Sequence, residues 1–250
     1  KNVAIPLAKD APLGWQGSLL IRNLFIKDTK GSLGKQPIAC AIDRIAITGT
    51  DARELKTKHI AKIDSVVVGK GSMALGLPDK STGKTNKTAK KSKLIESLFL
   101  NYVFIDSVAV SLDLNPKKIN ERIDATISFH AQNVAIPFTN ETPLAYENME
   151  LNITNLYVQP RKSIAYFKAK KITLNSITHA LQIDGFQMRQ RLAESKYAKH
   201  FGWDKAYIKM DIYRATIFGI PHKLRSLKDG IHLPKIAVLG LQTYLYKDKR

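Results

Sequence analysis

The sequence contains one partial phosphate-binding motif, Gly83-Lys84-Thr85. A complete phosphate-binding loop has another glycine five residues before Gly83, but this chain has Pro78 there. The surrounding residues also show no apolar periodicity, so we predict no nucleotide site at this position. Gly69-Lys70-Gly71 lacks the spacing of a dinucleotide-binding fingerprint and instead predicts a glycine-bearing turn.

Six histidines and one cysteine are the other side chains with potential for metal or nucleophilic chemistry. No two histidines lie four residues apart on an expected helix, and none pairs closely with Cys40, so we predict no metal site. No Gly-x-Ser-x-Gly elbow marks a nucleophile, and no cofactor motif is present. The residues of a Ser-His-Asp triad are distant from one another in sequence, so residue spacing does not test whether a triad is present. We therefore expect a non-enzymatic protein. The histidines are His59, His130, His179, His200, His222 and His232.

Basic side chains are the most abundant charged groups. Lys and Arg number 40 against 21 for Asp and Glu, which gives a formal charge of +19. Such a charge predicts attraction to nucleic acid, anionic membranes or phosphorylated lipids, although dispersed lysine is also a common device for solubility. Lysines beside Tyr166 and Phe167 are compatible with single-stranded nucleic acid or with a membrane surface. The basic surface candidates are Lys84, Lys87, Lys90, Lys91, Lys168, Lys170 and Lys171.

Composition predicts a folded chain. Hydrophobic residues make up 44% of the 250 residues, which is too many for a disordered protein. One cysteine excludes an intramolecular disulfide, and no apolar run approaches the roughly 20 residues of a membrane-spanning helix. The chain starts at Lys1 without a leader segment, so we expect it to be a piece of a longer protein.

An internal repeat organises the chain. Residues 2–6 and 133–137 both read Asn-Val-Ala-Ile-Pro, and Asn23-Leu24-Phe25-Ile26 matches Asn155-Leu156-Tyr157-Val158 further on. Chance similarity between alternating strands is the competing explanation, but the matching segments occur in the same order in both halves of the chain. We predict two divergent β repeats, residues 1–130 and 131–250. The aspartates that recur at equivalent places suggest turns or strand-edge charges: Asp64, Asp106, Asp113, Asp184, Asp204 and Asp211.

Alternation with a period of two dominates both repeats. Between residues 108 and 114, Val and Leu alternate with Ala, Ser and Asp, which is typical of a strand with one apolar and one polar face. Further strands are expected at 18–27, 38–48, 60–69, 123–129, 149–158, 163–174, 180–189, 206–218 and 235–246. We predict a mainly β protein with an elongated, largely antiparallel, curved sheet.

Two segments predict short helices, residues 93–102 and residues 190–200. The first carries Leu94, Leu98 and Tyr102 at helical spacing. Residues 79–93 are rich in Lys, Ser and Thr and predict a mobile, solvated loop.

The second repeat resembles AsmA-like proteins of Gram-negative envelopes. Residues 191–212 are similar to a segment of that family in which a basic and aromatic stretch ends in Gly202-Trp203-Asp204 and then enters an alternating strand. Residues 244–250 are similar to the strand end and charged turn of such proteins. The similarity covers mainly residues 150–250, and the first repeat follows through internal similarity.

This resemblance implies a U-shaped β groove that holds acyl chains, as in AsmA-like, TamB-like and other bridge-like lipid-transfer proteins. It further implies a periplasmic or envelope location, an anchor segment absent from this chain, and lipid, anionic membrane or other envelope proteins as partners. The charge of +19 and the Lys-rich segment are not features that the family requires. The candidate groove residues are Val108, Val110, Leu112, Ile123, Ile127, Leu151, Ile153, Ile208, Met210 and Ile212.

We expect this chain to hold or transfer lipid in an apolar β groove and so to assist outer-membrane and envelope biogenesis. The first alternative is a closed β-sandwich that acts as an interaction or adhesion module, with the same apolar residues as its core. The second is a basic nucleic-acid-binding protein, which the lack of any recognised reading motif disfavours.

Overall fold

A computed structural model provides the fold. It describes residues 16–28, 38–51, 60–76, 97–113, 122–137, 146–160, 163, 165–201, 206–220 and 235–247. The segment 79–93 lies outside these residues, as do Lys84, Lys87, Lys90 and Lys91.

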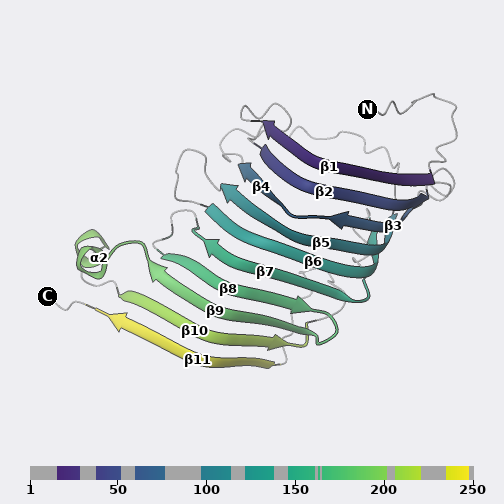
Figure 1. Ribbon diagram of the computed structural model, residues 1–250. Coiled ribbons are helices and arrows are strands. Elements are labelled where there is room, and N and C mark those ends of the chain that lie inside the picture. The colour runs from purple at the N-terminus through teal and green to yellow at the C-terminus, as the bar shows by residue number, and fades with distance from the viewer. Residues whose placement is uncertain are drawn as a thin grey trace, which may run out of the picture.

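All the described strands belong to one large sheet, which confirms the prediction of a mainly β fold (Figure 1). The sheet has 11 strands, and no second sheet packs on it in the described part of the chain. The strands are β1 (Gln16–Asp28), β2 (Ile38–Asp51), β3 (Ile60–Val68), β4 (Gly71–Gly76), β5 (Ser97–Asp113), β6 (Arg122–Pro137), β7 (Met149–Val158), β8 (Ala165–Asn175), β9 (Ala180–Gln190), β10 (Tyr207–Phe218) and β11 (Lys235–Tyr246).

Neighbouring strands are antiparallel except at β5, which is parallel to β3 and β4. β3 and β4 lie end to end between β2 and β5. Gly69 and Lys70 form the interruption between them, where the Gly69 N–H donates to the carbonyl of Arg44 and the Asp43 N–H donates to the carbonyl of Lys70. The glycine-bearing turn predicted here is therefore a two-residue break, and β4 was not predicted.

The helix predicted at residues 93–102 is wrong from Ser97 onward, because β5 begins there. Leu98 and Leu100 pack in one apolar cluster, whereas Phe99 between them is 39% exposed. Pairing with β3 and β6 on both sides outweighs the weak helical spacing of this short segment. The second predicted helix is present as α2 (Glu194–Phe201).

The pairing register gives the sheet two chemically different faces, because directly paired residues share a face. On one side Val110 pairs with Ala125 and Leu112 with Ile123. We call this side the apolar face, and it includes every residue that is paired in register with these four. The opposite side carries residues such as Asp124 and Lys168, and we call it the polar face. The predicted alternation is thus carried across the sheet.

The sheet is a single layer, so burial is shallow. No large side chain among the described residues is fully buried. The main apolar cluster lies on the apolar face around Leu100, Ala131 and Val134, with Val103 and Phe129 beside it. These residues flank Asn133, whose φ of 52° is in the left-handed region. A left-handed backbone conformation therefore lies within the main apolar cluster.

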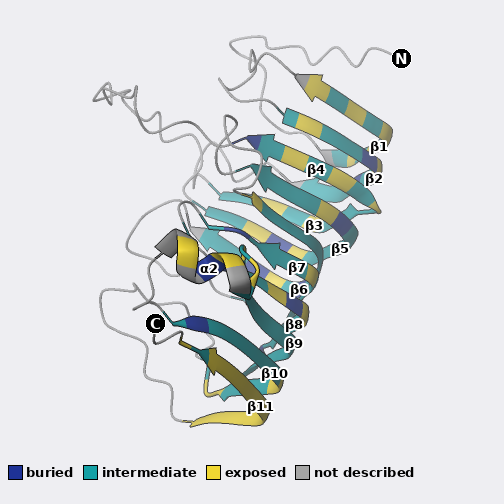
Figure 2. Cartoon of the chain, turned by 90° about the vertical axis from the view of Figure 1, so that its left-hand side faces the viewer, coloured by how far each residue is buried: buried dark blue, intermediate teal, exposed yellow. Residues whose placement is uncertain are grey.

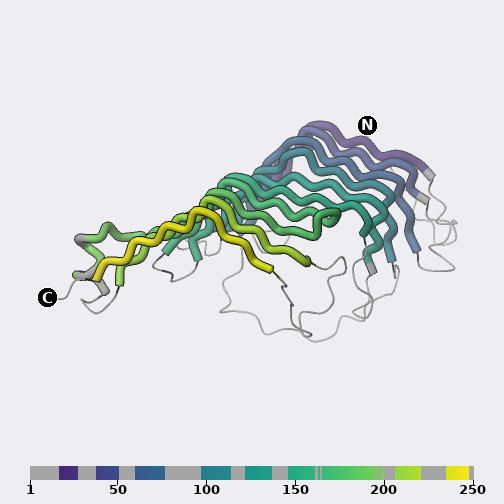
Figure 3. The backbone as a smooth tube through the Cα atoms, turned by 90° about the horizontal axis from the view of Figure 1, so that it is seen from below, coloured from purple at the N-terminus to yellow at the C-terminus, as the bar shows by residue number. Residues whose placement is uncertain are grey.

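Backbone bends recur across the strands and give them their curvature (Figure 3). Asn155 (φ 54°), Gly185 (φ 62°) and Gly240 (φ 65°) occupy one transverse row, in which Lys170 and Tyr213 on β8 and β10 alternate with them. Asn and Gly are the residues that adopt positive φ at low cost. The matching segments that begin at Asn23 and Asn155 both place this asparagine at positive φ.

Replacing Asn155 tests the bend. Asn155→Val should lower the free energy of unfolding by about 1–2 kcal/mol, because a β-branched side chain is strained at positive φ. Urea denaturation followed by circular dichroism measures the change. Asn155→Gly is the matched control and should unfold close to the parent. Equal stability of the Val variant and the parent would contradict a left-handed conformation at residue 155.

Candidate functional site

The ten candidate groove residues all lie on the apolar face. Val108 is 6% exposed and the other nine are half-buried. They belong to four strands: Val108, Val110 and Leu112 to β5, Ile123 and Ile127 to β6, Leu151 and Ile153 to β7, and Ile208, Met210 and Ile212 to β10.

Register joins these residues into a continuous apolar surface. Val108 pairs with Ile127, which pairs with Ile153, and the row continues through Ile172 to Ile183 on β9. A second row continues from Ile123 through Val158, Phe167, Met188 and Met210. The rings of Phe167 and Phe186 lie 6.2 Å apart on this surface. Sequence reasoning did not single out β8 and β9, although both alternate with the same period.

Helix α2 lies at one end of the sheet (Figure 2) and contacts residues of the polar face on β10 and β11. The Tyr197 ring packs edge-on against Tyr207 at 5.3 Å. The hydroxyl of Tyr244 donates to the carboxylate of Glu194 at 3.1 Å, and this bond is the main cause that raises the pKa of Tyr244. The described helix therefore leaves the apolar face uncovered. In the described part of the chain, no helix is long and apolar enough to cross a bilayer.

Lys168, Lys170 and Lys171 are exposed residues on the side opposite the candidate groove residues. Lys168 pairs with Tyr157, and its ammonium lies 5.9 Å from that ring and 5.5 Å from the ring of Tyr166. Lys168 and Lys170, together with Arg122 and Tyr157, border an open cavity of about 760 Å³ on the polar face. The structure thus places three of the seven basic candidates on one face of β8 and two of them at this cavity.

Two ion pairs cross the C-terminal strands on the polar face. Arg189 donates two hydrogen bonds to the carboxylate of Asp211, at 2.7 and 2.9 Å. Arg214 donates to Asp184 at 2.6 Å, and Gln182 donates to the same carboxylate at 2.7 Å. Desolvation raises the pKa of Asp184, but the hydrogen bonds from Arg214 and Gln182 and the nearby positive charges outweigh it, so its pKa is lowered.

The other recurring aspartates lie in different surroundings. Asp64 accepts a hydrogen bond of 3.1 Å from Asn101 on the neighbouring strand. Asp106 borders a small cavity on the polar face together with His130, whose ring centroid lies 5.3 Å from that of Tyr102. Asp113 pairs with Arg122 across β5 and β6, and Asp204 lies outside the described residues. Within the described ranges, no three His, Cys, Asp or Glu side chains gather as metal ligands would.

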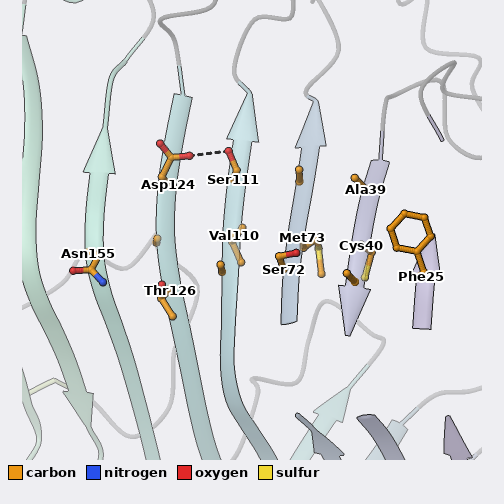
Figure 4. A pocket seen from close by; sticks show the side chains of 14 residues that line it. Phe25, Ala39, Cys40, Ser72, Met73, Val110, Ser111, Asp124, Thr126 and Asn155 are labelled. Atoms are coloured by element: carbon orange, nitrogen blue, oxygen red, sulfur yellow. Dashed lines mark hydrogen bonds between the residues drawn. The ribbon is translucent and has the colours of Figure 1, made fainter. Parts of the chain in front are cut away.

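A shallow depression of about 390 Å³ crosses the polar face over the N-terminal strands (Figure 4). Small side chains line it, with the Phe25 ring at one end and Asn155 at the other. Its carboxylate, Asp124, accepts a hydrogen bond of 2.7 Å from Ser111 and pairs with Arg122 at 2.8 Å. The depression therefore offers few free polar groups to a ligand, and the apolar face is the stronger candidate site.

Comparison with known proteins adds no functional assignment. No protein-family model and no curated protein matches this chain.

The Asp184–Arg214 pair gives a prediction about pH. A lowered carboxyl pKa contributes stability above the unfolded pKa of about 3.8, and this contribution is lost as the pH falls through the folded pKa. Arg214→Gln should therefore unfold at lower urea concentration than the parent near neutral pH, and the difference should shrink at about pH 2. A difference that stays constant over this range would show that the charge of Asp184 is not involved.

Proposed function

We propose that this chain holds lipid acyl chains on its apolar face, in a groove formed by the bent sheet. The observation that carries the proposal is a continuous, half-buried apolar surface that no described layer covers. A surface of this extent is energetically costly in water and marks a binding site. Holding or transferring lipid in this way would assist envelope biogenesis, in line with the resemblance to AsmA-like proteins.

An acyl chain suits this surface in shape and energy. The surface is a strip of Ile, Val, Leu and Met side chains without a deep pocket, and an unbranched, flexible chain can follow such a strip. Each buried methylene contributes about 0.8 kcal/mol, so ten buried methylenes contribute roughly 8 kcal/mol before ordering costs. The strip presents no charged residue at the ten candidate positions, so it gives a head group no partner. The lipid head group would stay at the water-exposed edge of the strip.

The charge of the chain supports an anionic lipid or membrane as the partner. The net charge is +19, and the exposed lysines at 168, 170 and 171 lie on the polar face. Lysines near an anionic surface contribute about 1 kcal/mol each. On this proposal the polar face attracts the membrane while the apolar face holds the acyl chains. A periplasmic or envelope location, with an anchor outside this chain and other envelope proteins as partners, belongs to the same proposal.

Photo-crosslinking from adjacent residues of β7 tests the site. A photoreactive amino acid at Ile153, on the apolar face, should crosslink to phospholipid when the protein is expressed in a Gram-negative host, and mass spectrometry of the adduct identifies the lipid. The same amino acid at Thr154, on the polar face of that strand, is the matched control and should give at least about tenfold less adduct.

The proposal would be overturned by equal crosslinking at both positions. It would also fail if organic extracts of the purified chain contained no lipid and the chain took up no fluorescent phospholipid. Those results would favour an apolar face covered by protein.

The basic candidates give a separate prediction. A triple change of Lys168, Lys170 and Lys171 to Gln should weaken binding to vesicles of anionic phospholipid by at least about tenfold, because three favourable contacts of about 1 kcal/mol each are removed. Vesicle co-sedimentation measures the effect, and neutral phosphatidylcholine vesicles are the control. Unchanged binding to anionic vesicles would show that other basic residues attract the membrane.

A further inference from the structure

β11 forms one edge of the sheet and is exposed along its length. Every residue from Lys235 to Leu245 is exposed, and the segment from Ile236 to Tyr246 contains no charged residue and no proline. Natural edge strands usually carry charge, proline or a covering segment that prevents pairing with another chain. The large apolar side chains exposed on this strand are Ile236, Val238, Leu239, Leu241, Tyr244 and Leu245.

The opposite edge of the sheet differs in this respect. β1 carries exposed Arg22 and Lys27 within the strand, and such charges oppose pairing with another sheet. The two edges are therefore not equivalent, because the only charge on β11 is Lys235 at its first position, whereas β1 has charges within the strand.

We propose that two copies of this chain associate through antiparallel pairing of their β11 strands, about a two-fold axis normal to the sheet. In the proposed register Leu239 lies opposite Gly240 of the second copy, and Val238 lies opposite Leu241. The flanking pairs are Ala237 with Gln242 and Ile236 with Thr243. The pairing makes one sheet from two, with both apolar faces on the same side.

This register continues what β10 and β11 already show. Ile212 pairs with Leu241 and Ala215 with Val238, so apolar-face residues on both sides of Gly240 meet apolar-face residues. In the proposed pair, Val238 and Leu241 meet each other in the same way. Within the sheet, Gly240 has a φ of 65° and lies opposite Tyr213 on β10, which is not at positive φ. The proposed pair repeats this arrangement, because Gly240 there lies opposite Leu239, which is also not at positive φ.

The second copy's β1 edge is a poorer partner for β11. β1 and β11 run in the same direction in the sheet (Figure 1), so a head-to-tail contact that keeps both apolar faces on one side pairs these two edges in parallel. Parallel pairing is slightly less stable per residue than antiparallel pairing. It also brings the exposed Arg22 and Lys27 of β1 to the contact. The structure therefore favours a closed dimer over an open head-to-tail chain.

Sedimentation equilibrium of the 250-residue chain is the first test. The parent should show a species of twice 28.0 kDa. Leu239→Lys places a charge at the centre of the proposed pair and should raise the dimer dissociation constant at least about tenfold. Because Leu239 is 61% exposed, this change should leave the fold intact, which circular dichroism checks. The matched control is Phe25→Lys on β1, where the parent side chain is 71% exposed, and it should leave the dimer unchanged.

Disulfide crosslinking tests the register directly. In a Cys40→Ser background, Ala237→Cys combined with Gln242→Cys should give a covalent dimer on oxidation. The two cysteines of one chain are five residues apart on a strand, about 17 Å, which is too far for an internal disulfide. Ala237→Cys combined with Thr243→Cys is the control, because Thr243 lies on the other face, and it should give no covalent dimer on oxidation.

Each remaining outcome overturns the proposal. A monomer at every concentration would show that β11 does not pair with itself. Loss of association in the Phe25→Lys variant would indicate head-to-tail contact between β11 and β1. Equal crosslinking of the two cysteine pairs would show that the register is wrong. None of these measurements depends on lipid, so they leave the proposed function to its own tests.

Discussion

The alternation of apolar and polar residues along eleven strands is the constraint on which the rest of the structure depends. A sheet built from such strands has one face that avoids water, and a globular protein covers that face with a second layer. In the described part of this chain the second layer is missing, and α2 packs on the polar face. The shallow burial throughout the sheet follows from this arrangement.

Curvature makes the uncovered face tolerable. The bends at Asn133 and at the row through Asn155, Gly185 and Gly240 are backbone conformations fixed by the residue types that occupy them. The side chains that flank Asn133, such as Ala131 and Val134, are among the most buried of the sheet. The curvature is thus a property of the residue types at these positions.

The sequence was informative where a local pattern determines structure. Strands such as β7 and β11 were predicted within a residue or two, because alternation and turn residues both mark their limits. The segment 97–102 was misassigned because its apolar residues fit two periods, and only pairing with strands distant in sequence decides between them. The parallel arrangement of β3, β4 and β5 is likewise a long-range choice.

The residues of the candidate site could be predicted from the sequence, but the number of strands that it spans could not. The ten apolar residues were found from alternation, yet the register that joins them across β8 and β9 depends on the transverse row of bends. One signal for these bends was available, because Asn-Leu-aromatic occurs at both Asn23 and Asn155. Without a structure, nothing in that tripeptide indicates a positive φ rather than an ordinary turn.

A single-layer sheet has a further consequence for how this protein loses its structure. Each strand makes its main contacts with the strands hydrogen-bonded to it, so stability is a sum of terms between neighbours, as in repeat proteins. Unfolding can then begin at an edge and advance strand by strand, instead of occurring as one cooperative event. β5 and β6, which are long and paired on both sides, would be the last to open, and amide protons there would exchange most slowly.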